Sequence, residues 1–321
     1  MQLKYLLFVF LSLSFFDIAY SQKYRLVDSI VDGYPKVTIT ADQLVELINK
    51  DFSKQDEKAR AVFKWVTANI SYDVDLAKAM ESKPIYAFSY KTEKEKEIKE
   101  KKFKLDLVGN AMVSRKAVCH SYAALVEYLC VRAGLEAKII IGNLKSDPSE
   151  IGALPNSMNH AWNVVKIDND WKFIDATLAA GFISLKTNSF KFYFNESYFF
   201  TNPERFFLNH YPLDEKWLLT KKNKKDFAQL PLFFGNYFQN NYQLIKPESG
   251  LYLTSEGENF IFAIKGLDQY DTVEYSSSIN NKIIYLDQKN DLDYTIYLAD
   301  KKNSFVSIFV NRKIIAIYKI I

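Results

Sequence analysis

Apolar residues recur at helical spacing in two stretches near the N-terminal end of the chain. Thr40 and Gln43 form a capping-box pattern, which predicts a helix over residues 41–52. A second start signal at Ser53 precedes apolar positions that recur every three or four residues as far as Ile70. We expect both helices to pack one face against a core.

A third helical stretch begins at Cys119 and ends before Gly134, a residue free to adopt the positive φ that closes a helix. Its apolar stripe consists of Ala123, Val126, Leu129 and Cys130. This spacing predicts a buried helix with Cys119 in its first turn.

Other apolar patterns predict extended structure. Residues 22–40 alternate loosely, and residues 137–141 form a short continuous apolar run typical of a buried strand. Residues 161–167 and 171–176 have the composition of two strands, and the polar residues 168–170 between them supply a turn. We therefore expect helices and strands in one mixed domain.

Three further stretches have no clear period. Residues 91–106 form a mixed charge run, which predicts a solvated helix or a flexible loop. Residues 145–158 form a polar loop that we expect beside a cleft. Residues 190–238 are rich in aromatic side chains, which favours core packing, with a surface groove for a peptide or polymer as the alternative.

The C-terminal part changes character after a boundary that we place near residues 230–240. Seven short runs rich in Ile, Val, Tyr or Phe follow, separated by turn residues. They cover residues 242–246, 259–265, 270–275, 282–286, 293–299, 304–310 and 313–320. This pattern predicts a small immunoglobulin-like β-sandwich over residues 241–321.

The first 21 residues have the pattern of a secretory signal peptide. Lys4 precedes an apolar run over residues 5–16, and Ala19 and Ser21 are small residues before the expected cleavage. The run is shorter than the roughly 20 residues that span a bilayer, so we expect no stable membrane insertion after cleavage. The mature protein is then exported, to a periplasmic, cell-surface or extracellular location.

Composition reduces the set of partners and cofactors that we expect. The chain of 321 residues is 48% hydrophobic, enough for a large core, and its net charge of +4 gives no reason to expect nucleic acid as a partner. Its 2 cysteines and 3 histidines are too few for a clustered zinc site. No glycine-rich phosphate loop is present, so we expect no cofactor and no metal.

Cys119 is the candidate nucleophile, because unpaired N–H groups and the positive dipole end at a helix start favour a thiolate. A small buried core residue is the alternative interpretation. Cys119 and Cys130 cannot form a disulfide on one helix, because 11 residues separate them by roughly 16 Å. The presence of an unpaired thiol in an exported protein, where thiols tend to be oxidised, favours a functional role for Cys119.

His160 and Asp175 complete a Cys–His–Asp order along the chain. A thiol nucleophile needs a base, and the base needs an acidic group that fixes its tautomer. His120 adjoins Cys119 but points about 100° away around the helix. His210 lies in the aromatic stretch and is interpreted as structural.

The turn of the hairpin decides whether His160 and Asp175 can meet. A two-residue turn at Asn169 and Asp170 would set Asp175 opposite Val164, roughly 13 Å along the strand from His160. We therefore predict a wider turn or a bulge that shifts the register.

Three motifs resemble the transglutaminase-like superfamily, within the papain-like cysteine enzymes. They are AVCHSYAAL at 117–125, NHAWNVV at 159–165 and WKFIDAT at 171–177. The sequence is most similar to the bacterial and kyphoscoliosis-peptidase-like branch, over roughly residues 41–219. Ser121 stands where relatives often have glycine, and Leu178 where they often have tryptophan.

The resemblance implies that Cys119 is the nucleophile, His160 the general base and Asp175 the orienting acid. We place Tyr122, Asn159 and Trp162 beside the substrate. The implied fold class is α+β: a papain/transglutaminase-like catalytic core over residues 22–235, with helices packed on an antiparallel sheet, followed by the β-sandwich.

Two function classes remain open. The first is an enzyme that acts on amide bonds of a protein or peptide substrate through a Cys119 thioester, completed by an amine in crosslinking or by water in hydrolysis. The second is a non-catalytic transglutaminase-like scaffold, or a module that binds protein or glycan.

Overall fold

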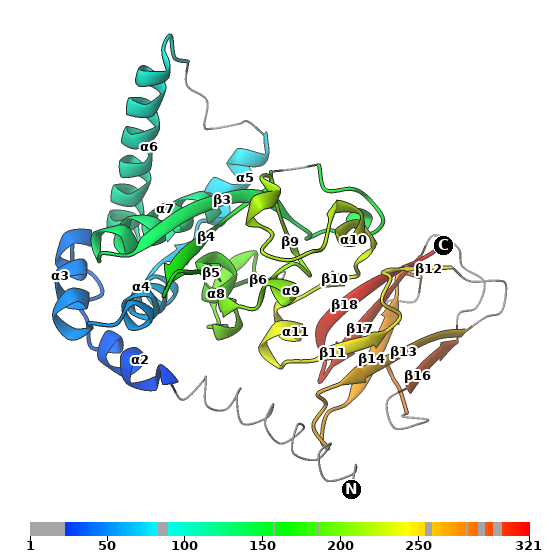
Figure 1. The fold of residues 1–321 in the computed structure, drawn as a ribbon. Coiled ribbons are helices and arrows are strands. Elements are labelled where there is room, and N and C mark those ends of the chain that lie inside the picture. The colour runs from blue at the N-terminus through cyan, green and yellow to red at the C-terminus, as the bar shows by residue number, and fades with distance from the viewer. Residues whose placement is uncertain are drawn as a thin grey trace, which may run out of the picture. The chain divides into compact units, whose positions relative to one another are not determined.

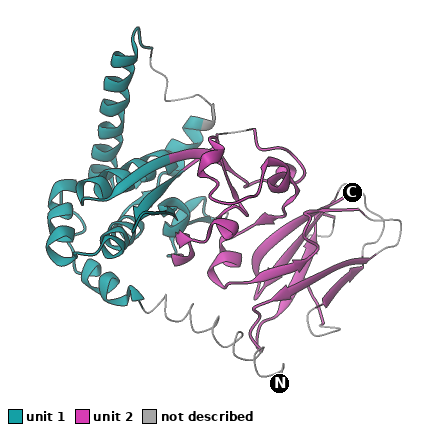
Figure 2. Ribbon diagram, viewed as in Figure 1, with its two compact units in different colours: residues 1–139, 162–194 teal, residues 140–161, 195–321 magenta. Residues whose placement is uncertain are grey.

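The computed structural model describes residues 23–82, 89–156, 158–184, 186–253, 259–279, 282–287, 293–297 and 304–321. The predicted signal peptide lies outside these residues. The chain divides into two compact units, residues 1–139 with 162–194 and residues 140–161 with 195–321 (Figure 2).

The first unit is built mainly from helices around α4. Its helices are α2 (Arg25–Asp32), α3 (Ala41–Asp51), α4 (Gln55–Asn69), α5 (Val74–Ser82), α6 (Glu93–Ser114), α7 (Cys119–Arg132) and α8 (Ala176–Ala180) (Figure 1). Helix α4 contacts α2, α3, α7 and α8. Its residues Ala59, Val62, Phe63 and Val66 are fully buried, as their spacing predicts.

Helix α2 corrects the prediction that residues 22–40 are extended. Val27 and Val31, four residues apart, are both buried on one face of the helix. Asp28 lies on the same helix and accepts two hydrogen bonds from Arg60 on α4, at 2.8 and 2.6 Å. The short helix is therefore stabilised by burial and by an ion pair with a residue distant in sequence.

Helix α3 confirms the predicted capping box. The N–H of Gln43 donates to the Thr40 hydroxyl at 3.2 Å, and the N–H of Thr40 donates to the Gln43 side chain at 3.0 Å. Helix α4 begins at Gln55, slightly later than the predicted start at Ser53, and its N-cap Lys54 offers no side-chain cap.

Thr40→Ala is expected to lower the free energy of unfolding by about 1 kcal/mol, because the N–H of Gln43 at the start of α3 loses the hydroxyl that accepts its hydrogen bond. Urea denaturation followed by circular dichroism measures the change. Thr38→Ala, at an exposed position just before the helix, is the matched control and should be neutral. Equal effects of the two substitutions would contradict the capping role.

The charged stretch at residues 91–106 belongs to α6, a helix of 22 residues whose N-terminal half is mostly exposed. The solvated-helix alternative is thus confirmed over the flexible loop. Within the described part of the chain, no helix combines the length and the apolar character needed to cross a membrane.

Five strands form the sheet that carries the predicted histidine. They are β3 (Glu136–Leu144), β4 (His160–Ile167), β5 (Asp170–Ile174), β8 (Phe199–Thr201) and β9 (His210–Pro212), in the order β8-β5-β4-β3-β9. Strands β4 and β5 pair antiparallel, and so do β3 and β9. The fold class is therefore α+β, with an antiparallel sheet beside the helices.

The hairpin between β4 and β5 is tight, so the predicted wide turn or bulge is wrong. The pairs run without a shift from Asn163–Ile174 to Ile167–Asp170. The turn residues Asp168 and Asn169 have φ of 50° and 71°, a left-handed conformation that both residue types tolerate.

The turn also lies one residue earlier than the sequence interpretation assumed. Continuing the observed register sets Asp175 across from Trp162 instead of Val164. His160 is then two residues, roughly 7 Å, along the strand from the position that faces Asp175, and on the same face of the sheet. A tight hairpin is therefore compatible with a contact between His160 and Asp175.

Two small pairs of strands complete the first unit. Strands β1 (Ser71–Tyr72) and β2 (Lys116–Ala117) pair in parallel, immediately before α7. Strands β6 (Gly181–Ser184) and β7 (Ser189–Phe192) form an antiparallel hairpin after α8.

In the second unit, strands form at all seven predicted C-terminal runs. The corresponding strands are β11 (Gln243–Lys246), β13 (Asn259–Lys265), β14 (Val273–Ser277), β15 (Ile284–Tyr285), β16 (Asp293–Tyr297), β17 (Ser304–Val310) and β18 (Lys313–Ile320), with β10 (Leu232–Phe233) and β12 (Leu251–Tyr252) in addition. They form two sheets, β10-β18-β17-β14-β15 with β12 beside β18, and β11-β13-β16. The rings of Phe260 on β13 and Tyr318 on β18 lie 5.1 Å apart between the two sheets, which gives a sandwich-like core.

Short helices connect the strands of this unit. They are α9 (Pro203–Phe206), α10 (Lys224–Gln229) and α11 (Gly235–Gln239), with 3-10 turns at Pro148–Glu150, Glu196–Tyr198 and Glu215–Trp217. Strand β10 pairs with β18, so chain from before residue 235 contributes to the C-terminal sheet. The domain boundary near residues 230–240 stays a prediction.

Candidate active site

Cys119 is the first residue of α7, as predicted, and its side chain is partly exposed. The preceding residue Val118 is the N-cap and has no side-chain acceptor for the N–H groups of the first turn. The positive end of the helix dipole therefore acts at the position of the thiol and favours its anionic form.

The start of α7 is fixed by contacts with residues 70–73, which directly follow α4. The N–H groups of Ser71 and Asp73 donate to the carbonyls of Arg115 and Ala117, each at 2.9 Å. The Tyr122 hydroxyl donates to the carbonyl of Ile70, the C-cap of α4. These bonds hold the first turn of α7 in one orientation, a condition for a positioned nucleophile.

Asp175 follows β5 and is the N-cap of α8, where its carboxylate accepts a hydrogen bond from the N–H of Leu178 at 3.0 Å. The side chain is fully buried. Burial raises the pKa of the Tyr122 phenol on α7, and the charges of the nearby Tyr72 and Asp175 raise it further. Asp175 therefore lies near the first turn of α7.

Asn163 of β4 connects that strand to the same turn of α7. Its side-chain NH2 donates to the carbonyl of Ala123 at 2.9 Å and approaches that of Lys138 on β3 at 3.4 Å. The side chain is 1% exposed, so losing these bonds would leave buried polar groups unsatisfied. Asn163 thus fixes β4 against α7 at Ala123, which lies four residues after Cys119.

His160 opens β4 and is buried. The preceding residue, Asn159, pairs through its side chain with the backbone of Leu144: its oxygen accepts from the Leu144 N–H at 2.7 Å, and its NH2 donates to the Leu144 carbonyl at 3.0 Å. Asn159, predicted to lie beside the substrate, therefore positions the entry to β4.

His210 is a residue whose place beside His160 the sequence interpretation missed. It pairs with Leu144 in the β3–β9 register, and its ring centroid lies 5.6 Å from that of His160. The His210 ring stacks on Phe206 at 3.8 Å, and its Nδ1 lies 3.3 Å from the Phe206 carbonyl. A proton on Nδ1 would donate to that carbonyl and leave Nε2 as an acceptor.

His160, Asp175 and His210 form one buried group of potential ligands. A ring nitrogen of each histidine and a carboxylate oxygen of Asp175 all lie within 4.8 Å of one another. An imidazole held beside a buried carboxylate is the arrangement of a general base with a fixed tautomer. Two imidazoles and a carboxylate are also a donor set that zinc accepts, so the absence of a metal stays a prediction.

The other predicted site residues lie in the core. Tyr122 and Trp162 are each 1% exposed, on α7 and β4. Cys130 is fully buried, and burial raises the pKa of its thiol to about 12, so its thiolate is scarce at neutral pH. His120 is partly buried, and burial together with the charge of Lys104 lowers the pKa of its ring.

Comparisons with known proteins agree with the motifs. The family model described as the transglutaminase-like superfamily matches residues 40–176. Kyphoscoliosis peptidase of Mus musculus is 25% identical over 239 residues, which are 73% of this chain and 33% of that protein. Hillarin of Drosophila melanogaster is 25% identical over 201 residues, which are 57% of this chain and 21% of that protein.

The chain thus spans about a third or less of the length of these curated relatives. A solved structure described as the crystal structure of a TGase has a TM-score of 0.28 and 19% identity, and the match covers 52% of this chain and 39% of that chain. The family model identifies residues 40–176, which contain Cys119, His160 and Asp175, as a transglutaminase-like domain.

Proposed function

We propose that this protein is an exported cysteine enzyme of the transglutaminase-like type that hydrolyses amide bonds of proteins or peptides or transfers their acyl groups to amines. The observation that carries the proposal is the buried grouping of His160 with Asp175 in a chain whose one partly exposed cysteine begins α7. The family match over residues 40–176 supports the same assignment.

In the first half of the proposed reaction, the Cys119 sulfur attacks the carbonyl carbon of an amide while His160 takes the thiol proton. The C–N bond breaks, His160 passes that proton to the leaving amine or ammonia, and a thioester remains on Cys119. Asp175 holds the imidazole in one tautomer and stabilises the imidazolium that forms between the two proton transfers.

In the second half, water or a primary amine attacks the thioester and gives its proton to His160, and the Cys119 thiolate leaves. Water completes hydrolysis, and an amine completes crosslinking. The word peptidase in the name of the mouse relative favours hydrolysis for this chain. The N-terminal pattern of residues 1–21 supports export of the enzyme.

Asp175→Asn is expected to lower kcat for release of new amino groups from casein, or for incorporation of dansylcadaverine into it, by at least about 100-fold. Asparagine keeps the shape and the N-cap of α8 but cannot stabilise an imidazolium. The assay is run with and without the amine, so that it separates hydrolysis from crosslinking.

Asp170→Asn is the matched control, because the Asp170 side chain is 77% exposed at the other end of the same strand. It should leave kcat unchanged. Wild-type protein without either activity, or equal effects of the two substitutions, would favour the non-catalytic scaffold.

A further inference from the structure

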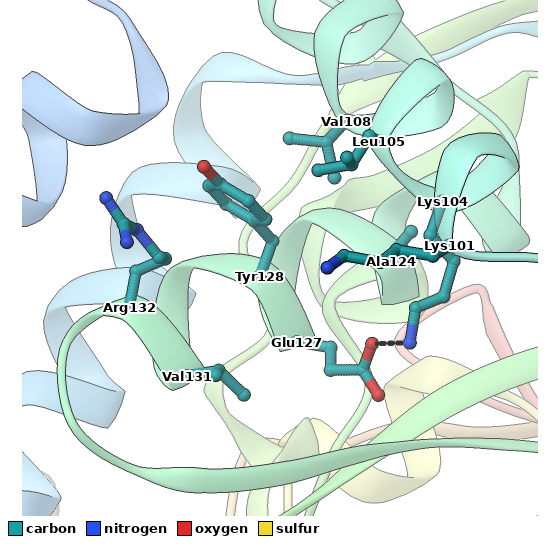
Figure 3. Close-up of a pocket in the computed structure, with 9 residues that line it drawn as sticks. All are labelled: Lys101, Lys104, Leu105, Val108, Ala124, Glu127, Tyr128, Val131 and Arg132. Atoms are coloured by element: carbon teal, nitrogen blue, oxygen red, sulfur yellow. Dashed lines mark ion pairs between the residues drawn. The ribbon is translucent and has the colours of Figure 1, made fainter. Parts of the chain in front are cut away.

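A groove between α6 and α7, within the first unit, has no role in the proposed reaction. Its volume is about 570 Å³, within the range of roughly 300–1,000 Å³ typical of sites for small organic ligands. Both helices contribute side chains at helical spacing, Lys101, Leu105 and Val108 from α6 and Ala124, Val131 and Arg132 from α7 among them. Figure 3 shows these side chains around the groove.

The groove has an apolar floor and half-exposed apolar walls. Val108 and Ala124 are 6% and 2% exposed, whereas Leu105 and Val131 remain 49% and 51% exposed. Covering the walls would remove apolar surface from water, which is favourable in proportion to the area covered. Binding of an aliphatic chain in the groove is therefore favourable.

Positive charges flank this apolar surface. In Figure 3 Lys101 and Lys104 lie on one side of the groove and Arg132 on the other. Lys104 pairs with Glu127, and Arg132 with Asp42 at 3.1 Å. Lys101 takes part in no ion pair among the residues that the structure describes, so its ammonium is available to an anion at the mouth of the groove.

We infer that this groove binds a long-chain carboxylate, with the aliphatic chain over Leu105, Val108 and Val131 and the carboxylate at Lys101. Charge complementarity argues for an anion, and the apolar floor argues for a chain of methylenes. The groove is independent of Cys119 chemistry, so this inference does not rest on the proposed function.

Displacement of the fluorescent probe 11-(dansylamino)undecanoate from the full-length protein measures binding. Hexanoate, octanoate, decanoate and dodecanoate are the competitors. We expect about fourfold tighter binding for each two added methylenes, because the walls of the groove remain partly open and the gain in binding free energy is about half that of complete burial. Decylammonium, with a decyl chain and the opposite charge, should compete at least about tenfold more weakly than decanoate.

Two pairs of variants locate the site. Lys101→Met should weaken decanoate binding about fivefold, because it removes the charge while keeping most of the apolar part of the side chain. Lys102→Met, next on α6 but outside the lining of the groove, should change binding by less than about twofold. Val131→Trp should abolish probe binding by filling the groove, whereas Val113→Trp, at a position on α6 that is 88% exposed, should not.

Circular dichroism and thermal unfolding show whether each variant is folded. Similar affinities for Lys101→Met and Lys102→Met, no dependence on chain length, or undiminished binding to folded Val131→Trp would each overturn the inference. Equal competition by decanoate and decylammonium would also overturn it, because the groove would then bind any aliphatic chain.

Discussion

Cys119→Ala is expected to abolish amide hydrolysis and amine incorporation, with a loss in kcat of at least about 10⁴-fold, because no thioester can form without the sulfur. The same variant should keep its unfolding transition, since Cys119 is partly exposed and contributes little to the core. Casein cleavage, dansylcadaverine incorporation and urea denaturation measure the two expectations. Activity that survives in Cys119→Ala would show that another group carries the reaction.

The two cysteines provide an internal control for thiol reactivity. Iodoacetamide should modify Cys119 at mildly acidic pH, because the start of α7 and the imidazolium of His160 both favour a thiolate. Cys130 should stay unmodified, because burial raises the pKa of its thiol to about 12 and also blocks access. Mass spectrometry after a short reaction identifies the modified residue.

His160→Ala should move the labelling of Cys119 to higher pH, because the positive charge that favours the thiolate is gone. Asp175→Asn should move it less, because Asp175 acts through the histidine. Labelling of Cys119 only at alkaline pH, unchanged in His160→Ala, would remove the nucleophile from the proposed reaction and favour the scaffold.

Local signals made much of this fold predictable. The Thr40–Gln43 capping box involves residues three apart, and the stripe that starts at Cys119 follows one helix. The seven C-terminal runs are apolar segments separated by turn residues, so a few consecutive residues are enough to predict each strand. These features depend on neighbours in sequence, which is why the sequence alone specifies them.

Contacts between residues distant in sequence explain why the prediction for residues 22–40 was wrong and why the place of His210 was missed. Helix α2 is stabilised by Val27, Val31 and the pairing of Asp28 with Arg60, 32 residues away, and none of these contacts shows in a short window. His210 comes beside His160 because β9 pairs with β3 and sets His210 opposite Leu144. Only the strand register reveals that relation.

The candidate site was partly predictable for the same reason. The family motifs identify Cys119, His160 and Asp175 by local patterns, but they do not identify Asn163 or the exact turn of the hairpin. A one-residue difference in the position of the turn changes which residue faces Asp175. The tight turn at Asp168–Asn169 shows that the hydrophobic pattern alone did not fix this register.

Asp28→Ala is expected to lower the free energy of unfolding by about 3 kcal/mol, because it removes the carboxylate that accepts two hydrogen bonds from the buried Arg60 guanidinium. The Arg60 side chain is 3% exposed and that of Asp28 is 21% exposed, so water compensates little of the loss. Arg60 also lies over the rings of Tyr24, Phe63 and Phe194, at 5.3–5.7 Å, which hold the guanidinium in place. Urea denaturation at neutral pH measures the change.

Asp32→Ala on the same helix is the matched control. Asp32 also pairs with a cation of α4, Lys64 at 3.3 Å, but its side chain is 57% exposed, so its loss should cost less than about 1 kcal/mol. The double variant Asp28→Ala with Arg60→Met should recover much of the stability, because methionine fills the apolar site without a charge. Equal costs for Asp28→Ala and Asp32→Ala, or no recovery in the double variant, would mean that helix propensity, and not the buried ion pair, stabilises α2 against α4.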